Sequence, residues 1–202
     1  MSIVGNSGPD SHAANYNPPV MPAFPYERLV VIGTTASGKS TLARRLAERF
    51  GLDFIELDAL HWERNWQAAP EQVFRARTEE ATRARRWVVA GNYEAVRGIV
   101  WPRAQAVVWL DYSFGRVLWQ LTVRTLRRSL RREELWNGNR ERLWWHLKFW
   151  SDESLYRWLL KTYWRRRREY PRLLAESENA RLRIIRLQSP RAAEAWLQSL
   201  SG

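Results

Sequence analysis

A chain of 202 residues is long enough for one α/β domain, and the absence of cysteine excludes a disulfide framework and a thiolate metal site. No apolar run approaches the roughly 18 residues of a membrane-spanning helix, and residues 1–26 lack the basic start and apolar core of a secretory signal, so we expect a cytoplasmic protein. The net charge of +12, from 33 basic and 21 acidic residues, indicates anionic partners such as nucleotides, phosphorylated metabolites, nucleic acid or a membrane surface.

The chain divides into a tail and one domain. Residues 1–26 are rich in Asn, Ser, Pro and Ala, and we predict a disordered tail that joins the fold near Tyr26. In residues 27–202, short apolar runs alternate with helical stretches, which predicts a three-layer α/β fold whose parallel sheet is covered on both faces. The five predicted strands are residues 28–32, 54–57, 87–90, 106–110 and 182–187.

The first predicted strand leads into GTTASGKST, which matches the phosphate-loop pattern G-x-x-x-x-G-K-[ST] in full. A helix is predicted to follow, because apolar residues recur every four positions as far as the helix-stopping Gly51. In this arrangement backbone N–H groups converge on a phosphate, Lys39 reaches the β- and γ-phosphates, and the Ser40 hydroxyl holds Mg²⁺. The segment predicts a site for a nucleoside triphosphate, formed by Gly33, Thr34, Thr35, Ala36, Ser37, Gly38, Lys39, Ser40 and Thr41.

Ligands of open parallel sheets bind beyond the carboxyl ends of the strands, so the residues after the second and third strands are candidates for an acceptor site. We predict that Asp58 orients or deprotonates an acceptor hydroxyl, or holds the metal through water; capping of the following turn is the alternative. His61 is more simply a packing residue, whereas Trp62 and Trp66 could wall a pocket. The predicted acceptor-binding residues are Asp58, His61, Trp62, Gly91, Asn92, Tyr93, Arg97 and Arg103, the two arginines as partners of a phosphate or carboxylate.

Polar residues also follow the last two strands. Asp111, after the fourth strand, is either a cap of the next helix or a second carboxylate near Mg²⁺. Ser189 and Pro190, after the fifth, are predicted to begin a final helix, and an adenine could rest against their backbone. The predicted metal ligands are Ser40, Asp58 and Asp111.

Residues 113–180 separate the fourth and fifth strands and are too many for a simple crossover, which predicts an elaborated helical segment. Arg124, Arg127, Arg128, Arg131 and Arg132 recur at helical spacing on one face, where they repel one another unless an anion neutralises them. We favour phosphate contact over a solvated face for this stripe. The run of four arginines at residues 165–168 is more simply a solvated surface.

Several segments together resemble the adenylate-kinase-like P-loop proteins and, within them, the topology modulation protein (FlaR-related) kinases: GTTASGKST, ELDALHW, GNY, WPRAQAVVWLDYS and RREELWNGNRE. The resemblance extends from about residue 28 to residue 197. It implies a P-loop NTPase fold with strand order 2-3-1-4-5, Mg-ATP as donor, a lid bearing the arginine stripe, and Asp58 with Arg97 facing the acceptor. Such kinases usually carry a metal-holding aspartate where this chain has Ala90, so either Asp58 or Asp111 takes that role, or transfer is slow or absent.

We therefore expect an ATP-dependent kinase that phosphorylates a small acceptor and uses ATP and Mg²⁺. Lys39, Asp58, Arg124 and Arg128 are the predicted catalytic residues, and Arg127, Arg131, Ser189 and Pro190 are added to the nucleotide site. The alternative is a nucleotide-gated nucleic-acid-binding protein with vestigial transfer, which the charge and Ala90 favour. For the 13 tryptophans, packing in the lid and core is favoured over base stacking or a membrane interface.

Overall fold

The computed structural model describes residues 24–131, 136–138, 154–176 and 179–200, with the side chains of residues 129–131 left out. The predicted tail at residues 1–26 and the middle of the predicted lid therefore lie mostly outside the described residues. The last part of that tail belongs to the fold, because Phe24 and Tyr26 pack against the core. Phe24 stacks on Phe50 with ring centroids 4.0 Å apart.

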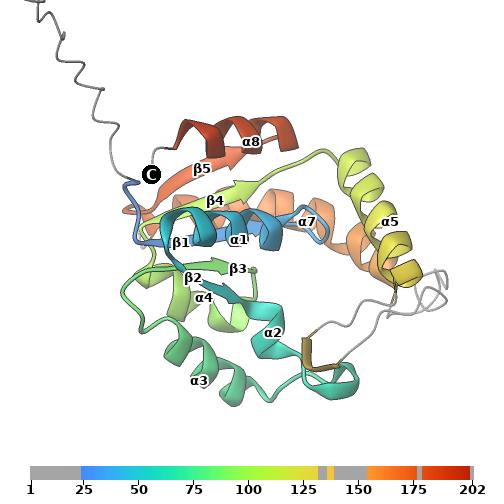
Figure 1. Ribbon diagram of the computed structural model, residues 1–202, viewed down its shortest axis with the longest axis horizontal. Coiled ribbons are helices and arrows are strands. Elements are labelled where there is room, and N and C mark those ends of the chain that lie inside the picture. Colours follow the sequence, from blue (N-terminus) through green and yellow to red (C-terminus); the bar gives the residue numbers. More distant parts are fainter. Residues whose placement is uncertain (1–23, 132–135, 139–153, 177–178, 201–202) are drawn as a thin grey trace, which may run out of the picture.

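Five parallel strands form a sheet in the order β2-β3-β1-β4-β5, which confirms the predicted fold class and strand order (Figure 1). In this order β1 is central, and its residue Val31 pairs with Ala90 on one side and Val108 on the other. The phosphate loop therefore leaves the sheet between the ends of β3 and β4. The strands are β1 (Arg28–Gly33), β2 (Asp53–Glu56), β3 (Trp87–Ala90), β4 (Ala106–Leu110) and β5 (Arg183–Leu187).

Helices cover both faces of the sheet, as its uniformly apolar central strands require. Successive residues of a strand point to opposite faces, so Val31 lies in one hydrophobic cluster while Val30 and Ile32 lie in the other. The first cluster includes residues of α1 (Lys39–Phe50), α5 (Phe114–Arg131) and α8 (Pro190–Ser199). The second includes residues of α3 (Glu71–Ala81) and α4 (Glu94–Val100).

Helix α7 (Leu155–Ala175) belongs to both layers. Its residues Leu159 and Tyr163 pack in the first cluster, and Tyr170 and Leu174 pack in the second. The helix therefore passes from one face of the sheet to the other, and contacts of its central residues, described below, show that it does so across the carboxyl ends of the strands. Short elements complete this edge: α2 (Leu57–His61), η1 (Arg64–Trp66) and η3 (Trp136–Gly138). The 3₁₀ turn η2 (Trp101–Arg103) precedes β4 at the opposite edge.

The described tryptophans differ in burial. Trp87, Trp101 and Trp109 are buried in the core, as the packing interpretation predicts. Tryptophans on α5 and α7 are more exposed, with exposed fractions of 62% for Trp119 and 56% for Trp164, although the Trp164 ring stacks on Phe114 with centroids 6.2 Å apart. In the part of the chain that is described, no helix is long and apolar enough to cross a membrane.

Gly91, directly after β3, is predicted to tolerate no side chain. Its φ is +146°, and a Cβ atom there would lie 2.8 Å from Cβ and Cδ1 of Leu57. Gly91→Ala should therefore lower the free energy of unfolding by about 1–3 kcal/mol, measured by urea denaturation. Gly98→Ala in α4 is the matched control, because a Cβ at that position meets no atom within 4 Å. That change should be neutral or stabilise the helix by roughly 0.5–1 kcal/mol, and equal losses in both variants would contradict the steric argument.

Candidate functional site

The phosphate loop has the geometry of an anion cradle. Gly33 and Gly38 adopt positive φ values of +153° and +89°. Helix α1 begins directly after Gly38, so its amino end faces the loop. A Cβ at Gly33 would lie 2.8 Å from the Leu110 carbonyl oxygen, which requires glycine there. The Ser37 hydroxyl is buried without a hydrogen-bond partner among the described residues. These features fit a bound polyphosphate, which would supply the missing acceptor.

Lys39 is the first residue of α1, and its Nζ donates a hydrogen bond to the Thr34 carbonyl oxygen at 2.9 Å. Burial lowers the pKa of the Lys39 ammonium to about 8, against the opposite effect of the nearby Asp58 carboxylate. Arg166 and Arg124 lower this pKa further by charge repulsion, and Glu56 raises it slightly. Side chains from α2, α7, α5 and β2 thus act electrostatically on the lysine of the loop. These mutually repelling cations favour an anionic ligand.

The predicted acceptor residues after β2 and β3 meet one another. The Tyr93 hydroxyl donates to Asp58 Oδ1 at 2.6 Å, and burial and the Asp58 charge raise the pKa of this tyrosine. The His61 ring lies between aromatic neighbours, with its centroid 4.6 Å from that of Tyr93 and 4.8 Å from that of Trp62. Burial lowers the pKa of His61, so the ring favours the neutral form. Asp58 is thus held by a tyrosine and remains close to Lys39.

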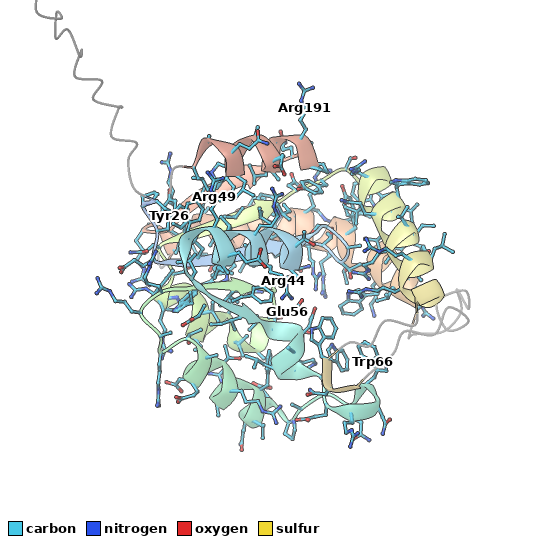
Figure 2. The ribbon with its side chains drawn as sticks, viewed as in Figure 1. Tyr26, Arg44, Arg49, Glu56, Trp66 and Arg191 are labelled. Atoms are coloured by element: carbon cyan, nitrogen blue, oxygen red, sulfur yellow. The ribbon has the colours of Figure 1, made fainter. Side chains whose placement is uncertain are left out.

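Tryptophan side chains cluster next to these predicted acceptor residues. Trp66 contacts both Trp62 and Trp136 edge to face, with centroids 5.8 and 6.2 Å apart. The Trp136 indole donates from Nε1 to Glu56 Oε2 at 3.0 Å, so η3 of the lid segment reaches the end of β2. Figure 2 shows Glu56 near the middle of the view and Trp66 to its lower right, below the position that α5 has in Figure 1. Trp62 and Trp66, which are predicted to wall an acceptor pocket, therefore lie in one cluster with Trp136 of the predicted lid segment.

Asn92 connects the phosphate loop to α7. When its amide nitrogen faces the Gly33 carbonyl oxygen at 3.2 Å, its amide oxygen accepts from Arg166 Nη1 at 3.2 Å and from the Tyr170 hydroxyl. The positive charge of Arg97 acts on the same tyrosine. The predicted turn after β3 is thus a hydrogen-bonded junction between loop and lid, and Arg97 lies near it.

The arginine stripe of α5 is only partly directed at the loop. Arg124 is half-buried and influences the Lys39 pKa, which places it at the site. Arg128 is half-buried and Arg127 is exposed. The Arg131 side chain and Arg132 lie outside the described residues.

The prediction that the four arginines of α7 are all solvated is wrong for two of them. Arg166 contacts Asn92, and Arg167 donates to the Tyr163 hydroxyl at 2.9 Å. Consecutive helical residues point about 100° apart, so a run of four cannot share one face. Arg165 and Arg168 are the exposed members of the run.

The interpretation of Asp111 as a metal ligand does not fit its contacts. Asp111 is buried, and its Oδ2 accepts from the Arg186 guanidinium, with Nε at 2.9 Å. Its Oδ1 lies 3.3 Å from Nε of Arg167. Both oxygens are therefore paired with arginines that join β4, β5 and α7. Such a pairing stabilises the base of the lid and competes with a metal ion.

Other predicted residues lie apart from this cluster. Arg103 lies at the amino edge of the sheet, where it donates to Thr82 Oγ1 at 2.8 Å and pairs with Glu79 at 3.2 Å. It therefore has no place in the acceptor site that we propose. Ser189 caps α8 by accepting from the Ala192 N–H at 3.1 Å, and Pro190 is the first residue of that helix, as predicted. Both follow the carboxyl end of β5.

Sequence reasoning missed Glu56 and Arg166. Glu56 was assigned to the interior of a strand ending at residue 57, whereas β2 ends at Glu56 itself. Its register partner is Ala90, so Glu56 places a carboxylate beside the position that lacks the usual aspartate. Arg166 could have been found, because it continues the spacing of the buried residues Leu159, Tyr163 and Tyr170 on α7.

The residues present fit one hydrated Mg²⁺ better than a metal held by protein alone. Among the described residues, no group of three or more His, Cys, Asp or Glu side chains could hold a metal. Mg²⁺ in kinases typically takes one or two carboxylates and completes its shell with phosphate and water. The Ser40 hydroxyl, Asp58 and Glu56 are the groups near Lys39 that fit this requirement.

Comparison with known proteins agrees with this geometry. Residues 35–100 match the shikimate kinase family. A shikimate kinase from Xanthomonas campestris pv. campestris (strain 8004) is 51% identical over 49 residues, which cover 24% of this chain and 23% of that protein. A tRNA dimethylallyltransferase from Sorangium cellulosum is 50% identical over 56 residues, 26% of this chain and 17% of that protein. The chain thus matches a quarter or less of the length of these relatives, whose names denote different reactions, so the shared segment does not define an acceptor.

A crystal structure of shikimate kinase from Bacteroides thetaiotaomicron superposes with a TM-score of 0.52 at 16% identity, covering 86% of this chain and 95% of that one. This likeness concerns the fold. Together with the strand order and the phosphate loop, it defines the chain as a protein of the P-loop kinase fold. Within this fold, residues 35–100 are similar to the shikimate kinase family.

The lowered pKa of Lys39 predicts that ATP affinity depends on pH. Below pH 8 the ammonium is charged with or without ligand, so this group causes no pH dependence. As the pH rises above 8, Lys39 of the ligand-free protein loses its proton. The bound polyphosphate raises the pKa of Lys39, so the protein must take up a proton when ATP binds. The affinity should then fall by up to about tenfold per pH unit, until the pKa of the bound state is reached.

Calorimetric titration of Mg-ATP at several pH values, in buffers of different ionisation enthalpy, measures both Kd and proton uptake. Lys39→Arg keeps its charge throughout this range and is the control. A Kd that is the same for the wild type on both sides of pH 8, without proton uptake, would contradict the proposed contact.

The paired state of Asp111 predicts a structural role. Asp111→Asn should reduce the free energy of unfolding by roughly 1–3 kcal/mol, because it leaves two guanidinium groups without their carboxylate; the half-exposed arginines keep the loss below that of a fully buried pair. Urea unfolding measures the loss, and the Mg²⁺ dependence of ATP binding should stay unchanged. A large loss of Mg²⁺ affinity at unaltered stability would restore Asp111 as a metal ligand.

Proposed function

We propose that this protein is an ATP-dependent phosphotransferase that transfers the γ-phosphate of Mg-ATP to a hydroxyl group of a small acceptor. One observation carries the proposal: the phosphate loop with Lys39, Asp58 and Arg166 meet at the carboxyl ends of the strands. Tyr93 holds Asp58 there, and Asn92 contacts Arg166. The shikimate-kinase-type segment supports the same class of reaction. The resemblance to topology modulation protein kinases is compatible with this proposal.

The proposed reaction needs positioning and charge stabilisation more than covalent chemistry. The loop amides and Lys39 hold the phosphates of ATP at the amino end of α1. Asp58, oriented by Tyr93, accepts the proton of the acceptor hydroxyl. The acceptor oxygen forms a bond to the γ-phosphorus while the bond from that phosphorus to the bridging oxygen of ADP breaks. Arg124 and Arg166 stabilise the negative charge on the transferred group.

Mg²⁺, when bound, neutralises charge on the phosphate oxygens. Ser40 and Glu56 would hold it, since Asp58 is assigned here to the acceptor hydroxyl. Glu56 supports activity in spite of Ala90, since it is the register partner of that residue on the neighbouring strand. A carboxylate is therefore available at the level where related kinases use an aspartate, and we do not assign that role to Asp111.

The small-molecule acceptor has more support than nucleic acid. Arg166 contacts Asn92 beside the loop and Arg167 pairs with Asp111, so these two arginines are not available as a basic outer surface. The acceptor region combines Asp58 and Tyr93 with tryptophan rings, an arrangement that suits a compact molecule bearing hydroxyl groups. We place this reaction in the cytoplasm.

A γ-phosphate transfer screen against sugar acids including shikimate, nucleosides and nucleoside monophosphates tests the proposal. Lys39→Ala should abolish turnover with any acceptor found. Arg166→Gln should lower kcat on the order of 100-fold, as expected for loss of one charge-stabilising donor. Arg165→Gln, its exposed neighbour that lies 3.6 Å from Glu169, removes the same charge and should change kcat less than twofold. Turnover that persists in Lys39→Ala, or equal effects of the two arginine variants, would refute the mechanism.

A further inference from the structure

A hollow lies at the amino edge of the sheet, away from the phosphate loop. It has a volume of about 420 Å³ and is lined by Arg28, Pro102, Arg103, Ala104, Gln105 and Arg181. Arg28 begins β1, whereas the loop follows Gly33 at the other end of this strand, so the two sites are roughly 17 Å apart along the strand. In Figure 2 Tyr26, just before β1, lies at the side of the molecule opposite to Trp66.

Two of the three arginines around this hollow carry uncompensated charge. In the described part of the chain, no carboxylate forms an ion pair with Arg28 or Arg181, whereas Arg103 is paired with Glu79 at 3.2 Å. The Nε of Arg28 is buried and lacks a hydrogen-bond acceptor among the described residues. The charge of Arg28 is therefore offset neither by a carboxylate nor by an acceptor at this nitrogen among the described residues.

The remaining polar group of the lining is also a donor. Gln105 Oε1 accepts from the backbone N–H groups of Glu27 at 2.6 Å and Arg28 at 3.1 Å. This fixes the orientation of the amide, so the side-chain NH₂ group can only donate to its surroundings. The Arg181 guanidinium donates to the Pro102 carbonyl oxygen, which anchors this exposed residue beside the hollow. The side-chain polar groups of the lining thus offer donors and positive charge, with no carboxylate among them.

We propose that this hollow is a second anion-binding site, which takes a small phosphate-bearing ligand. Guanidinium groups match phosphate oxygens in geometry and charge, and the volume lies within the range of small-molecule sites. The site does not depend on the proposed kinase activity, because it shares no residue with the phosphate loop. It would account for part of the +12 net charge, which the phosphate loop and the lid helices do not account for alone.

Calorimetric titration of the full chain with sodium pyrophosphate tests this site. The titration is carried out in the Lys39→Ala protein, and again in the wild type with its loop saturated by Mg²⁺ and a non-hydrolysable ATP analogue. Pyrophosphate binding should persist in both. Arg28→Gln and Arg181→Gln, introduced into the Lys39→Ala protein, should each raise Kd at least tenfold. Arg183→Gln is the matched control, because Arg183 is an exposed arginine at the same edge that does not line the hollow; its Kd should change less than twofold.

Loss of all binding in both settings would mean that pyrophosphate occupies the phosphate loop alone, and it would overturn the proposal. Equal weakening by Arg181→Gln and Arg183→Gln would overturn it as well, because that result denotes general attraction to a basic surface. Circular dichroism checks the fold of each variant. Should Arg28→Gln disturb the fold, the exposed Arg181 decides the question. None of these results depends on kinase turnover, so failure here and failure of the proposed function are distinguishable.

Discussion

The partly buried ammonium group of Lys39 sets the electrostatics of the carboxyl edge of the sheet. It is desolvated and lies near Arg124 and Arg166, while Asp58 and Glu56 offset these charges only in part, as its pKa of about 8 shows. Holding cations together in a site of reduced polarity costs free energy in the empty protein. A bound polyphosphate would reduce that cost. The site is therefore electrostatically preorganised for such a ligand.

Helix α7 is the element that keeps this arrangement in place. Because it packs on both faces of the sheet, its central turn is fixed over the strand ends. That turn presents Arg166 to Asn92 beside the loop, while its neighbour Arg167 is tied to Asp111 and to Tyr163, whose own hydroxyl donates to the Tyr112 carbonyl oxygen at 3.0 Å. Arg166 thus lies at the candidate site, and the next residue, Arg167, fixes the position of helix α7.

Much of the fold followed from local patterns, because apolar strands and a glycine loop have strong signatures. The predicted strands agree with the observed ones to within one residue at each end, and the phosphate loop lies where its motif placed it. The site was harder to predict, because it depends on which side of a helix faces the sheet. Asp111 and Arg103 follow strands or turns as site residues do, but both are paired with charges within the fold. Arg166 belongs to a run of four arginines, so the sequence does not show directly that it lies on the same side of α7 as the buried residues.

The strand order leaves β2 and β5 as the outer strands, and their charges are of opposite sign. Arg183 and Arg186 stand on β5, next to the 42%-exposed Ile184, while Asp53 and Glu56 stand on β2. Exposed strand edges can recruit another chain and extend the sheet. In this molecule two β5 edges brought together would place the exposed Arg183 of one copy near that of the other, and this repulsion disfavours symmetric pairing along β5.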